Sequence, residues 1–183
     1  MHSFYDPAAG WSEGDIDVVP LDGEPPGGFD CGRAEQNEYL YERAWRDHCR
    51  RLSATRLFFV KGILAGYLTT TADLVELGTR EKDPGIRYRS LPAIKIAQLG
   101  VDRRFAGCGL GQSLVAYALT FARRECARIG ARYVTVDAKP DLEGWYARQG
   151  FVRNRVVQKR REEAHPDASG VPISMRFDLL QME

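Results

Sequence analysis

The feature that most constrains the fold of this chain is the glycine-rich turn Gly107-Cys108-Gly109-Leu110-Gly111. Residues 93–101 before it alternate apolar and polar side chains over most of their length, as strands do. Residues 112–129 after it place apolar side chains on one face of a helix. The first N–H groups of a helix lack internal partners, and the aligned peptide dipoles add partial positive charge there. The sequence therefore predicts an anion site at this turn.

Two common nucleotide-binding turns fit this pattern poorly. A P-loop requires Gly-Lys-Ser/Thr at its end, whereas Gln112 and Ser113 follow Gly111. A Rossmann turn follows an early strand and has an acidic residue about 20 positions later, whereas the strand here lies in the middle of the chain. Because a glycine pattern alone is weak evidence, a simple strand–helix turn stays open at this point.

The remaining segments indicate a mixed α/β sheet in one domain. Strands are expected at residues 16–21, 56–60, 63–77, 93–101, 133–136, 151–158 and 173–180, and helices at 33–52, 112–129 and 141–149. Gly130 and Gly150 stand where the last two helices should end. The alternation breaks at Leu99-Gly100-Val101, which predicts a bulge where glycine permits close approach of a ligand.

Composition and cysteine spacing are typical of a cytoplasmic globular protein. The chain of 183 residues is 44% hydrophobic and 28% charged. It has no apolar run of about 20 residues and no secretory signal pattern at its start, so we expect no membrane partner. The four cysteines lack CxxC spacing, so we expect reduced thiols and no metal site.

Charge is distributed unevenly along the chain. Residues 1–30 contain seven acidic residues and no lysine or arginine, so all 26 basic residues lie after them. We therefore expect an acidic, Gly/Pro-rich leader with one short strand at residues 1–28 and a folded domain at 29–183. A basic domain suits an anionic cofactor or partner.

The segment 99–111, Leu-Gly-Val-Asp-Arg-Arg-Phe-Ala-Gly-Cys-Gly-Leu-Gly, resembles the cofactor motif of the GNAT acetyltransferases. Residues 144–151, Gly-Trp-Tyr-Ala-Arg-Gln-Gly-Phe, resemble the aromatic-Tyr-x-x-x-Gly-Phe element of the same family. Motif, spacing and order agree over residues 92–152. The resemblance implies a GNAT domain at 29–183, whose central strands are splayed to admit the pantetheine arm of acetyl-CoA.

The resemblance also implies which residues bind acetyl-CoA. In the family, the strand before the turn offers backbone groups to the pantetheine arm, and the amides of the turn hold the pyrophosphate. The residues carried over are Leu99, Gly100, Val101, Arg104, Ala106, Gly107, Cys108, Gly109, Leu110, Gly111 and Gln112. Ala106 departs from the usual Gln or Arg, and Cys108 from a longer polar residue. The loss of one side-chain hydrogen bond would weaken affinity by about 1 kcal/mol.

Tyr146, at the tyrosine position of the family, is the candidate catalytic acid. A thiol of pKa about 8.5 is a fair leaving group, and a tyrosine of pKa about 10 can protonate the departing thiolate. Backbone N–H groups at residues 99–101 could polarise the thioester carbonyl. The alternative for Tyr146 is a core aromatic beside Trp145 that anchors the short helix.

No general base is evident in the sequence. Asp73 and Glu76 lie on the expected substrate-side strand, but carboxylates there are more often solvated. An α-amine of pKa about 7.7–8.0 is partly neutral at pH 7, whereas a lysine of pKa about 10.4 is not. An α-amino acceptor therefore needs the least help from this site.

Within the family, the closest resemblance is to the toxin-like branch that acetylates aminoacyl-tRNA. Residues 29–32, Phe-Asp-Cys-Gly, ahead of a helix with Asn-Glu-Tyr-Leu at 37–40 resemble the entry segment of that branch, and residues 92–99 its cofactor strand. The implied function is acetyl-CoA-dependent N-acetylation of a primary amine by direct transfer. The implied partners are tRNA, an antitoxin protein and a second copy of the chain. A small-molecule or protein amine acetyltransferase and a non-catalytic acyl-CoA-binding module stay open as alternatives.

A basic stretch follows the tyrosine element. Its members are Arg153, Arg155, Lys159, Arg160 and Arg161. A solvated strand end and loop would explain these charges, and contact with phosphate would explain them as well.

Overall fold

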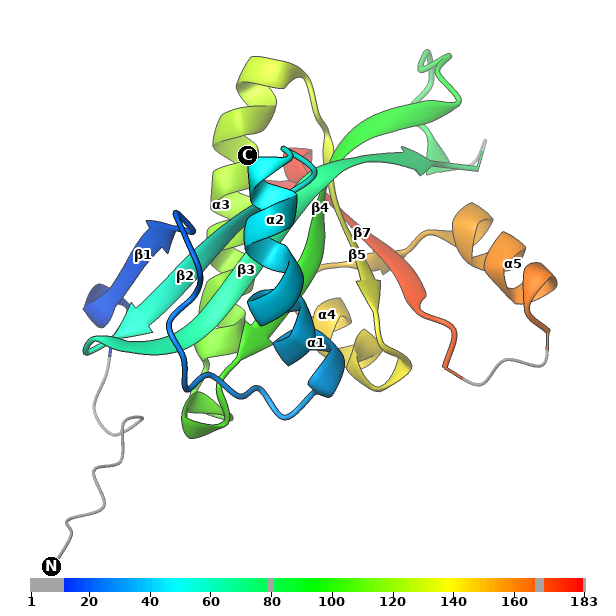
Figure 1. Cartoon of the computed structure of the whole chain (residues 1–183). Helices are drawn as coiled ribbons and strands as arrows, with labels where there is room; N and C mark the ends of the chain where they lie inside the picture. The colour runs from blue at the N-terminus through cyan, green and yellow to red at the C-terminus, as the bar shows by residue number, and fades with distance from the viewer. Residues whose placement is uncertain (1–11, 79–80, 167–169, 183) are drawn as a thin grey trace, which may run out of the picture. The chain divides into compact units, whose positions relative to one another are not determined.

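The computed structural model describes residues 12–78, 81–166 and 170–182. In this part of the chain, seven strands form one mixed sheet in the order β1-β2-β3-β4-β5-β7-β6 (Figure 1). The strands are β1 (Ile16–Pro20), β2 (Ala54–Val60), β3 (Ile63–Glu76), β4 (Ser90–Val101), β5 (Tyr133–Ala138), β6 (Val152–Arg153) and β7 (Ile173–Asp178). The α-helices are α1 (Ala34–Glu38), α2 (Ala44–Cys49), α3 (Leu110–Ile129), α4 (Glu143–Arg148) and α5 (Arg155–Ala164).

The chain divides into two compact units. The first contains the chain up to Thr71 together with Gln98–Ala118, and the second contains Ala72–Ala97 together with the chain from Leu119 onward. In the first unit, β1 pairs antiparallel with β2, and β2 pairs antiparallel with β3. Lys61 and Gly62, both with positive φ, form the tight hairpin turn that the sequence predicts between β2 and β3.

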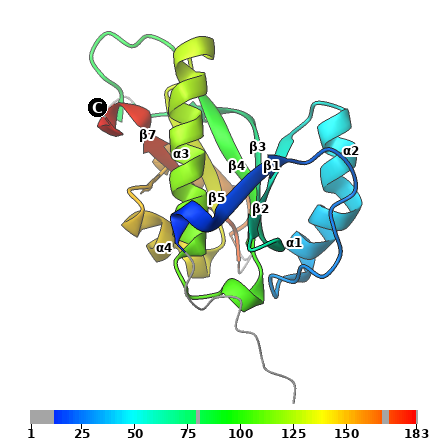
Figure 2. The same cartoon turned by 90° about the vertical axis from the view of Figure 1, so that its left-hand side faces the viewer.

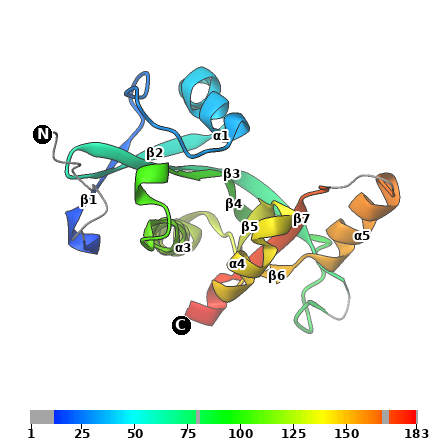
Figure 3. The ribbon, with the colours of Figure 1, turned by 90° about the horizontal axis from the view of Figure 1, so that it is seen from below.

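Between β1 and β2, residues 34–49 of the first unit form a helical rod of three pieces that follow one another (Figure 2). A single π-helical stretch, Tyr39–Arg43, joins α1 to α2. Tyr67 of β3 points toward this rod, because its hydroxyl donates a hydrogen bond of 2.8 Å to the carbonyl of Gln36. A side chain at the preceding residue, Gly66, would face the opposite side of the sheet. A Cβ added there would lie 3.0 Å from the side chain of Leu114 of α3. Figure 3 shows α1 and α3 on these opposite sides of β2 and β3.

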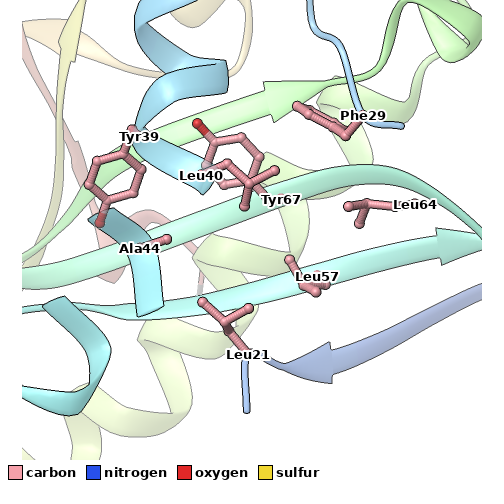
Figure 4. Close-up of a cluster of buried hydrophobic side chains, with 8 residues drawn as sticks. All are labelled: Leu21, Phe29, Tyr39, Leu40, Ala44, Leu57, Leu64 and Tyr67. Carbon is pink, nitrogen blue, oxygen red and sulfur yellow. The ribbon is translucent and has the colours of Figure 1, made fainter. Parts of the chain in front are cut away.

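A cluster of buried apolar side chains holds the rod on the sheet (Figure 4). Its members are Leu21, Phe29, Tyr39, Leu40, Ala44, Leu57, Leu64 and Tyr67. Each large apolar side chain that is fully buried contributes about 1.5–3 kcal/mol. Because Leu21 and Phe29 come from the segment between β1 and α1, the same cluster fixes both ends of that segment.

The second unit is built on β5. The strand pairs in parallel with the first part of β4 and antiparallel with β7, which in turn pairs with β6. The β4–β5 ladder covers only Ala93–Ile96 and Tyr133–Val136, although β4 runs on to Val101 and β5 to Ala138. The parallel ladder between the two central strands therefore spans four residue pairs.

Most elements agree with the sequence prediction, including the mixed α/β class, the long helix α3 and the glycine ends of α3 and α4. The predicted strand at 151–158 is wrong. The strand covers Val152 and Arg153 alone, and α5 begins at Arg155. The valines at 156 and 157 favoured a strand, but the Gln, Lys, Arg, Glu and Ala residues after them are good helix formers and outweigh this preference.

Two predictions stay open, the bulge near the end of β4 and the domain boundary at residue 28. The bulge expected at Leu99-Gly100-Val101 remains a prediction; an irregularity in register lies in the β2–β3 ladder between Phe58 and Phe59, where Ala65 of β3 has no partner on β2. The division at residue 28 also remains a prediction, and residues 1–11 of the expected leader lie outside the described residues. Across the described ranges, no helix has the length and apolar character needed to cross a membrane.

Candidate active site

The glycine turn connects a short 3-10 helix, Arg103–Phe105, to the start of α3. Gly107 and Gly109 have φ of 77° and 90°, a backbone conformation that favours glycine. The amides of Gln112 and Ser113 donate to the carbonyl of Gly109, which starts the helix. The two glycines thus let the chain reverse direction tightly enough for α3 to begin at Leu110.

The amides of the turn are the proposed donors of the anion site that the sequence predicts. Within the described residues, the N–H groups from Gly107 to Gly111 donate no hydrogen bond to another residue. Successive unpaired amides in such a turn form a concave anion site, and the dipole of α3 strengthens it. Ala106 is exposed and its methyl group offers no hydrogen bond, so backbone groups dominate this site. Cys108 is occupied locally, because its thiol donates to the carbonyl of Phe105.

The strand before the turn combines backbone groups with tight packing. Leu99 and Val101 are half-buried, whereas Gly100 is buried. A Cβ on Gly100 would lie 2.5 Å from Cε1 of Tyr67 and 3.1 Å from Cζ of Phe29. The core therefore excludes a side chain at position 100, and the predicted close approach of a ligand to this glycine stays a proposal.

Arg104 is tied to its own segment. Its Nε donates to Oδ1 of Asp102 at 2.7 Å, and its Nη2 donates to Oδ2 of Asp102 and to the carbonyl of Gly28, both at 2.9 Å. These hydrogen bonds raise the pKa of the arginine, with desolvation acting against them. A direct contact between Arg104 and the cofactor stays a proposal, and the structure shows a second use for this side chain.

Asp102 is a residue of this site that sequence reasoning missed. Its side chain is 3% exposed. Burial acts most strongly to raise its pKa, but the hydrogen bonds from Arg104 and from two backbone amides outweigh burial and hold the pKa below the usual range. The sequence pattern that could have identified Asp102 is Asp-x-Arg directly after the strand. At this spacing a carboxylate can accept hydrogen bonds from the amide and the guanidinium of the residue two positions later.

Tyr146 is a buried residue of α4 in the second unit, with 5% of its surface exposed. Its ring contacts Trp145 and Phe151 edge-on, at centroid distances of 4.8 and 5.5 Å. Its hydroxyl forms no hydrogen bond to another residue in the described part of the chain. Burial raises its pKa to about 12. Tyr146 thus packs in the core with a hydroxyl that stays protonated at neutral pH, and its role as the acid stays a proposal.

The raised pKa of Tyr146 predicts an unusual pH profile. An acid works in its protonated form, and a pKa of about 12 keeps that form dominant throughout the usual assay range. With an α-amino acceptor, kcat/KM should rise through a pKa of about 7.7–8.0 as the amine becomes neutral, and then stay level up to about pH 10.5. The profile is measured between pH 6 and 10.5 with brief incubations. A descending limb centred below pH 10 would contradict the assignment of Tyr146 as the acid.

The two carboxylates considered as bases are engaged in other contacts. Asp73 accepts a hydrogen bond of 2.5 Å from the hydroxyl of Thr135. Glu76 pairs with Arg160 at 2.7 Å and with Arg89 at 3.7 Å. These hydrogen bonds, Arg160 first, hold the pKa of Glu76 below its usual range, so Glu76 is a poor proton acceptor.

The basic stretch is largely paired inside the second unit. Arg161 bonds Asp137 at 2.8 Å, and Lys159 lies 3.7 Å from Glu163. Arg153 pairs with Glu143. Because Arg160 is also paired, these charges mainly connect α5 and its flanking residues to their surroundings, which favours the structural explanation for most of them.

Gly109 offers a direct test of the turn. Replacing Gly109 by alanine puts a Cβ on a residue with φ of 90°, at a cost of about 1–2 kcal/mol for an L-residue in this region. The dissociation constant for acetyl-CoA, measured by calorimetry, should rise about tenfold as the turn relaxes away from its geometry. Gly23→Ala, at a position with open space, is the matched control. Equal affinity in the two variants would show that the cofactor does not depend on this turn.

Comparisons with known proteins identify the family and the fold. A family model described as an acetyltransferase (GNAT) domain matches residues 33–165. A Tyr-to-Phe mutant of KacT superposes with a TM-score of 0.75 at 18% identity, over 92% of this chain and 99% of that chain. AtaT complexed with acetyl-methionyl-tRNAfMet gives 0.75 at 20% identity, over 92% and 97%. AtaTR bound with AcCoA gives 0.71 at 20% identity, over 92% and 96%.

At these identities, the solved structures show the shared fold. The family model covers well over half of the chain, and its GNAT domain takes acetyl groups from acetyl-CoA. The chain therefore belongs to the GNAT acetyltransferase family, as an acetyl-CoA-dependent enzyme.

Proposed function

We propose that this acetyltransferase transfers the acetyl group of acetyl-CoA to the α-amine of aminoacyl-tRNA. The proposed binding of acetyl-CoA is supported by the run of unpaired amides from Gly107 to Gly111 at the start of α3. These amides bind the pyrophosphate through the backbone, so the alanine at 106 costs one contact and leaves the anion site in place. The carbonyls and amides of residues 99–101 are the proposed partners of the pantetheine arm.

The proposed reaction is a direct transfer. The lone pair of the neutral amine attacks the thioester carbon, so a C–N bond forms and the C–S bond breaks. The CoA thiolate takes the proton of the Tyr146 hydroxyl. The ammonium formed on the acceptor loses one proton, which restores Tyr146 through solvent. No side chain becomes acetylated in this scheme, and the low pKa of an α-amine supplies the neutral nucleophile without a dedicated base.

Three observations support aminoacyl-tRNA as the acceptor. A similar structure is AtaT with acetyl-methionyl-tRNAfMet. All 26 basic residues of this chain lie after residue 30, which favours a polyanionic partner. The two candidate bases are engaged in other contacts, which disfavours a lysine acceptor of high pKa. The proposal places the enzyme in the cytoplasm, where charged tRNA is found.

Two further partners are proposed, the first on the basis of the comparisons and the second from the family resemblance of the sequence. Similar structures include AtaT bound to the C-terminus of the antitoxin AtaR and a KacTA–DNA complex. We include an antitoxin protein and a second copy of the chain as proposed partners. Co-expression with the product of a neighbouring gene, followed by size-exclusion chromatography, tests both of them.

A panel of acceptors tests the proposal. Labelled acetyl-CoA is incubated with the enzyme and with bulk charged tRNA, deacylated tRNA, polyamines or peptides. Label in the charged tRNA alone supports the proposal. Label in polyamines or peptides alone would replace it with an ordinary amine acetyltransferase. Acetyl-CoA binding without transfer to any acceptor would favour a CoA-binding module.

The salt dependence of the acceptor KM separates tRNA from small amines. Each phosphate contact releases counterions, so a nucleic acid that makes about six contacts should lose about 10³-fold in affinity between 50 and 200 mM salt. A small α-amino ester should change by less than about twofold over the same range. A flat KM for charged tRNA would contradict binding through its phosphates.

A further inference from the structure

Asp102 joins the cofactor turn to a distant segment of the first unit. Its Oδ1 accepts from the amide of Arg104 at 2.9 Å and from its Nε at 2.7 Å. Its Oδ2 accepts from Nη2 of Arg104 and from the amide of Asp30, both at 2.9 Å. Four N–H donors therefore surround one carboxylate that has 3% of its side chain exposed. Such an arrangement satisfies a deprotonated carboxylate, which only accepts hydrogen bonds.

Asp30 continues this connection to helix α1. Its carbonyl accepts from the amide of Arg103 at 2.9 Å. Its Oδ1 accepts from the amide of Gly32 and from Nδ2 of Asn37, both at 2.7 Å. Asn37 lies on α1 and in turn accepts from the amide of Cys31 at 3.0 Å. A continuous path of hydrogen bonds thus runs from α1 through Asp30 and Asp102 to the residues that enter the glycine turn.

We propose that Asp102 is a positioning residue that couples acetyl-CoA binding at the glycine turn to the order of residues 28–37 and α1. The proposal rests on the cofactor assignment of the turn and needs no particular acceptor. Asp102 follows the last residue of β4 and caps the 3-10 helix that leads into the turn. When acetyl-CoA fixes the turn, it also fixes Arg103 and Arg104. The N–H groups of these two arginines then hold the carboxylate of Asp102 and the carbonyls of Gly28 and Asp30 in place.

The geometry requires an aspartate at position 102. An asparagine has the same shape, but one of its two terminal atoms is an NH₂ donor. Because all four neighbours of the carboxylate are donors, either orientation of the amide sets donors against donors. One orientation loses the bonds from the amide and Nε of Arg104, and the other loses the bonds from Nη2 of Arg104 and the amide of Asp30. Two of the four bonds are lost in either case, and we expect the coupling to be lost with them.

Hydrogen exchange with and without acetyl-CoA tests the coupling directly. In the wild-type protein, acetyl-CoA should slow exchange at residues 106–112 and also at 30–41. In Asp102→Asn, the dissociation constant should rise about tenfold, because hydrogen bonds to a charged group are lost. At saturating acetyl-CoA, this variant should show protection at 106–112 alone. Protection of both segments in the variant would overturn the proposal, since a merely stabilising residue leaves the ligand-induced pattern unchanged.

A second variant covers the case in which Asp102→Asn fails to fold. Asp30 is half exposed, so Asp30→Asn should fold, and it weakens the link to α1 while leaving Asp102 on the turn. It should bind acetyl-CoA within about threefold of the wild type and lose protection at residues 33–41. Glu42→Gln removes an exposed carboxylate from the same helical rod and should keep the wild-type pattern. Protection at 33–41 in Asp30→Asn would contradict the path through Asp30.

The coupling and the acceptor proposal fail in different experiments. Exchange and calorimetry use acetyl-CoA alone, so a failure to acetylate tRNA leaves this test unaffected. A wild-type protein that shows protection at 106–112 alone would overturn the coupling and leave the proposed function standing.

Discussion

Replacing Tyr146 by phenylalanine is expected to lower kcat by about two to four orders of magnitude, the usual contribution of a positioned acid. The dissociation constant for acetyl-CoA should change by less than about twofold, since the cofactor binds through backbone amides and the lost hydroxyl acts on the departing thiolate. Phenylalanine keeps the ring contacts with Trp145 and Phe151, so the fold should survive. Steady-state rates, calorimetry and thermal unfolding on the same preparation check the three expectations.

Tyr133→Phe is the matched control for this experiment. Tyr133 is also buried and belongs to the same unit, but it lies on β5 and has no part in the proposed chemistry. Its loss of a hydroxyl should leave kcat within about threefold of the wild type. If Tyr146→Phe retained turnover, or if both variants lost it equally, the acid role of Tyr146 would be wrong and its aromatic packing would be its only function.

The second large effect is expected at Gly100. Gly100→Ala would place a Cβ 2.5 Å from the ring of Tyr67, which has no exposed surface and is anchored by its hydroxyl to the carbonyl of Gln36. Phe29 lies on the same side at 3.1 Å, so the ring cannot move without disturbing the cluster. Overpacking of this kind costs about 1–3 kcal/mol, and the free energy of unfolding in urea should fall by that amount.

Gly23→Ala provides the comparison for the stability measurement. Gly23 has open space around its Cα and no positive φ, so alanine should change the free energy of unfolding by less than about 0.5 kcal/mol. A stable Gly100→Ala variant with normal acetyl-CoA affinity would mean that the Tyr67 side of β4 can adapt. Gly100 would then not be needed for packing.

The sequence predicted the elements that have a local cause. Helix α3 has its apolar side chains on one face, and Gly107 and Gly109 stand where the backbone must take positive φ. The turn between β2 and β3 follows from Lys61-Gly62 for the same reason. Tyr146 was singled out by a family motif. The structure shows that it is buried, and its role as the acid stays a proposal.

Contacts between residues far apart in the chain could not be predicted from the sequence. The hydrogen bond between Asp102 and the amide of Asp30 joins residues 72 positions apart, and no local pattern indicates it. Gly100 has a normal place in a strand, so only the ring of Tyr67 reveals why a side chain is excluded there. The prediction of a strand at 151–158 is wrong because the helix preference of the residues after the two valines outweighs the strand preference of the valines.

The proposed acetylation of aminoacyl-tRNA is tested most directly by the mass of the aminoacyl-adenosine that nuclease releases from charged tRNA after incubation with the enzyme and acetyl-CoA. We expect a single added acetyl group on the α-amine, absent without acetyl-CoA and strongly reduced with Tyr146→Phe. An unchanged aminoacyl-adenosine, in the presence of an enzyme that binds acetyl-CoA and acetylates another amine, would contradict it.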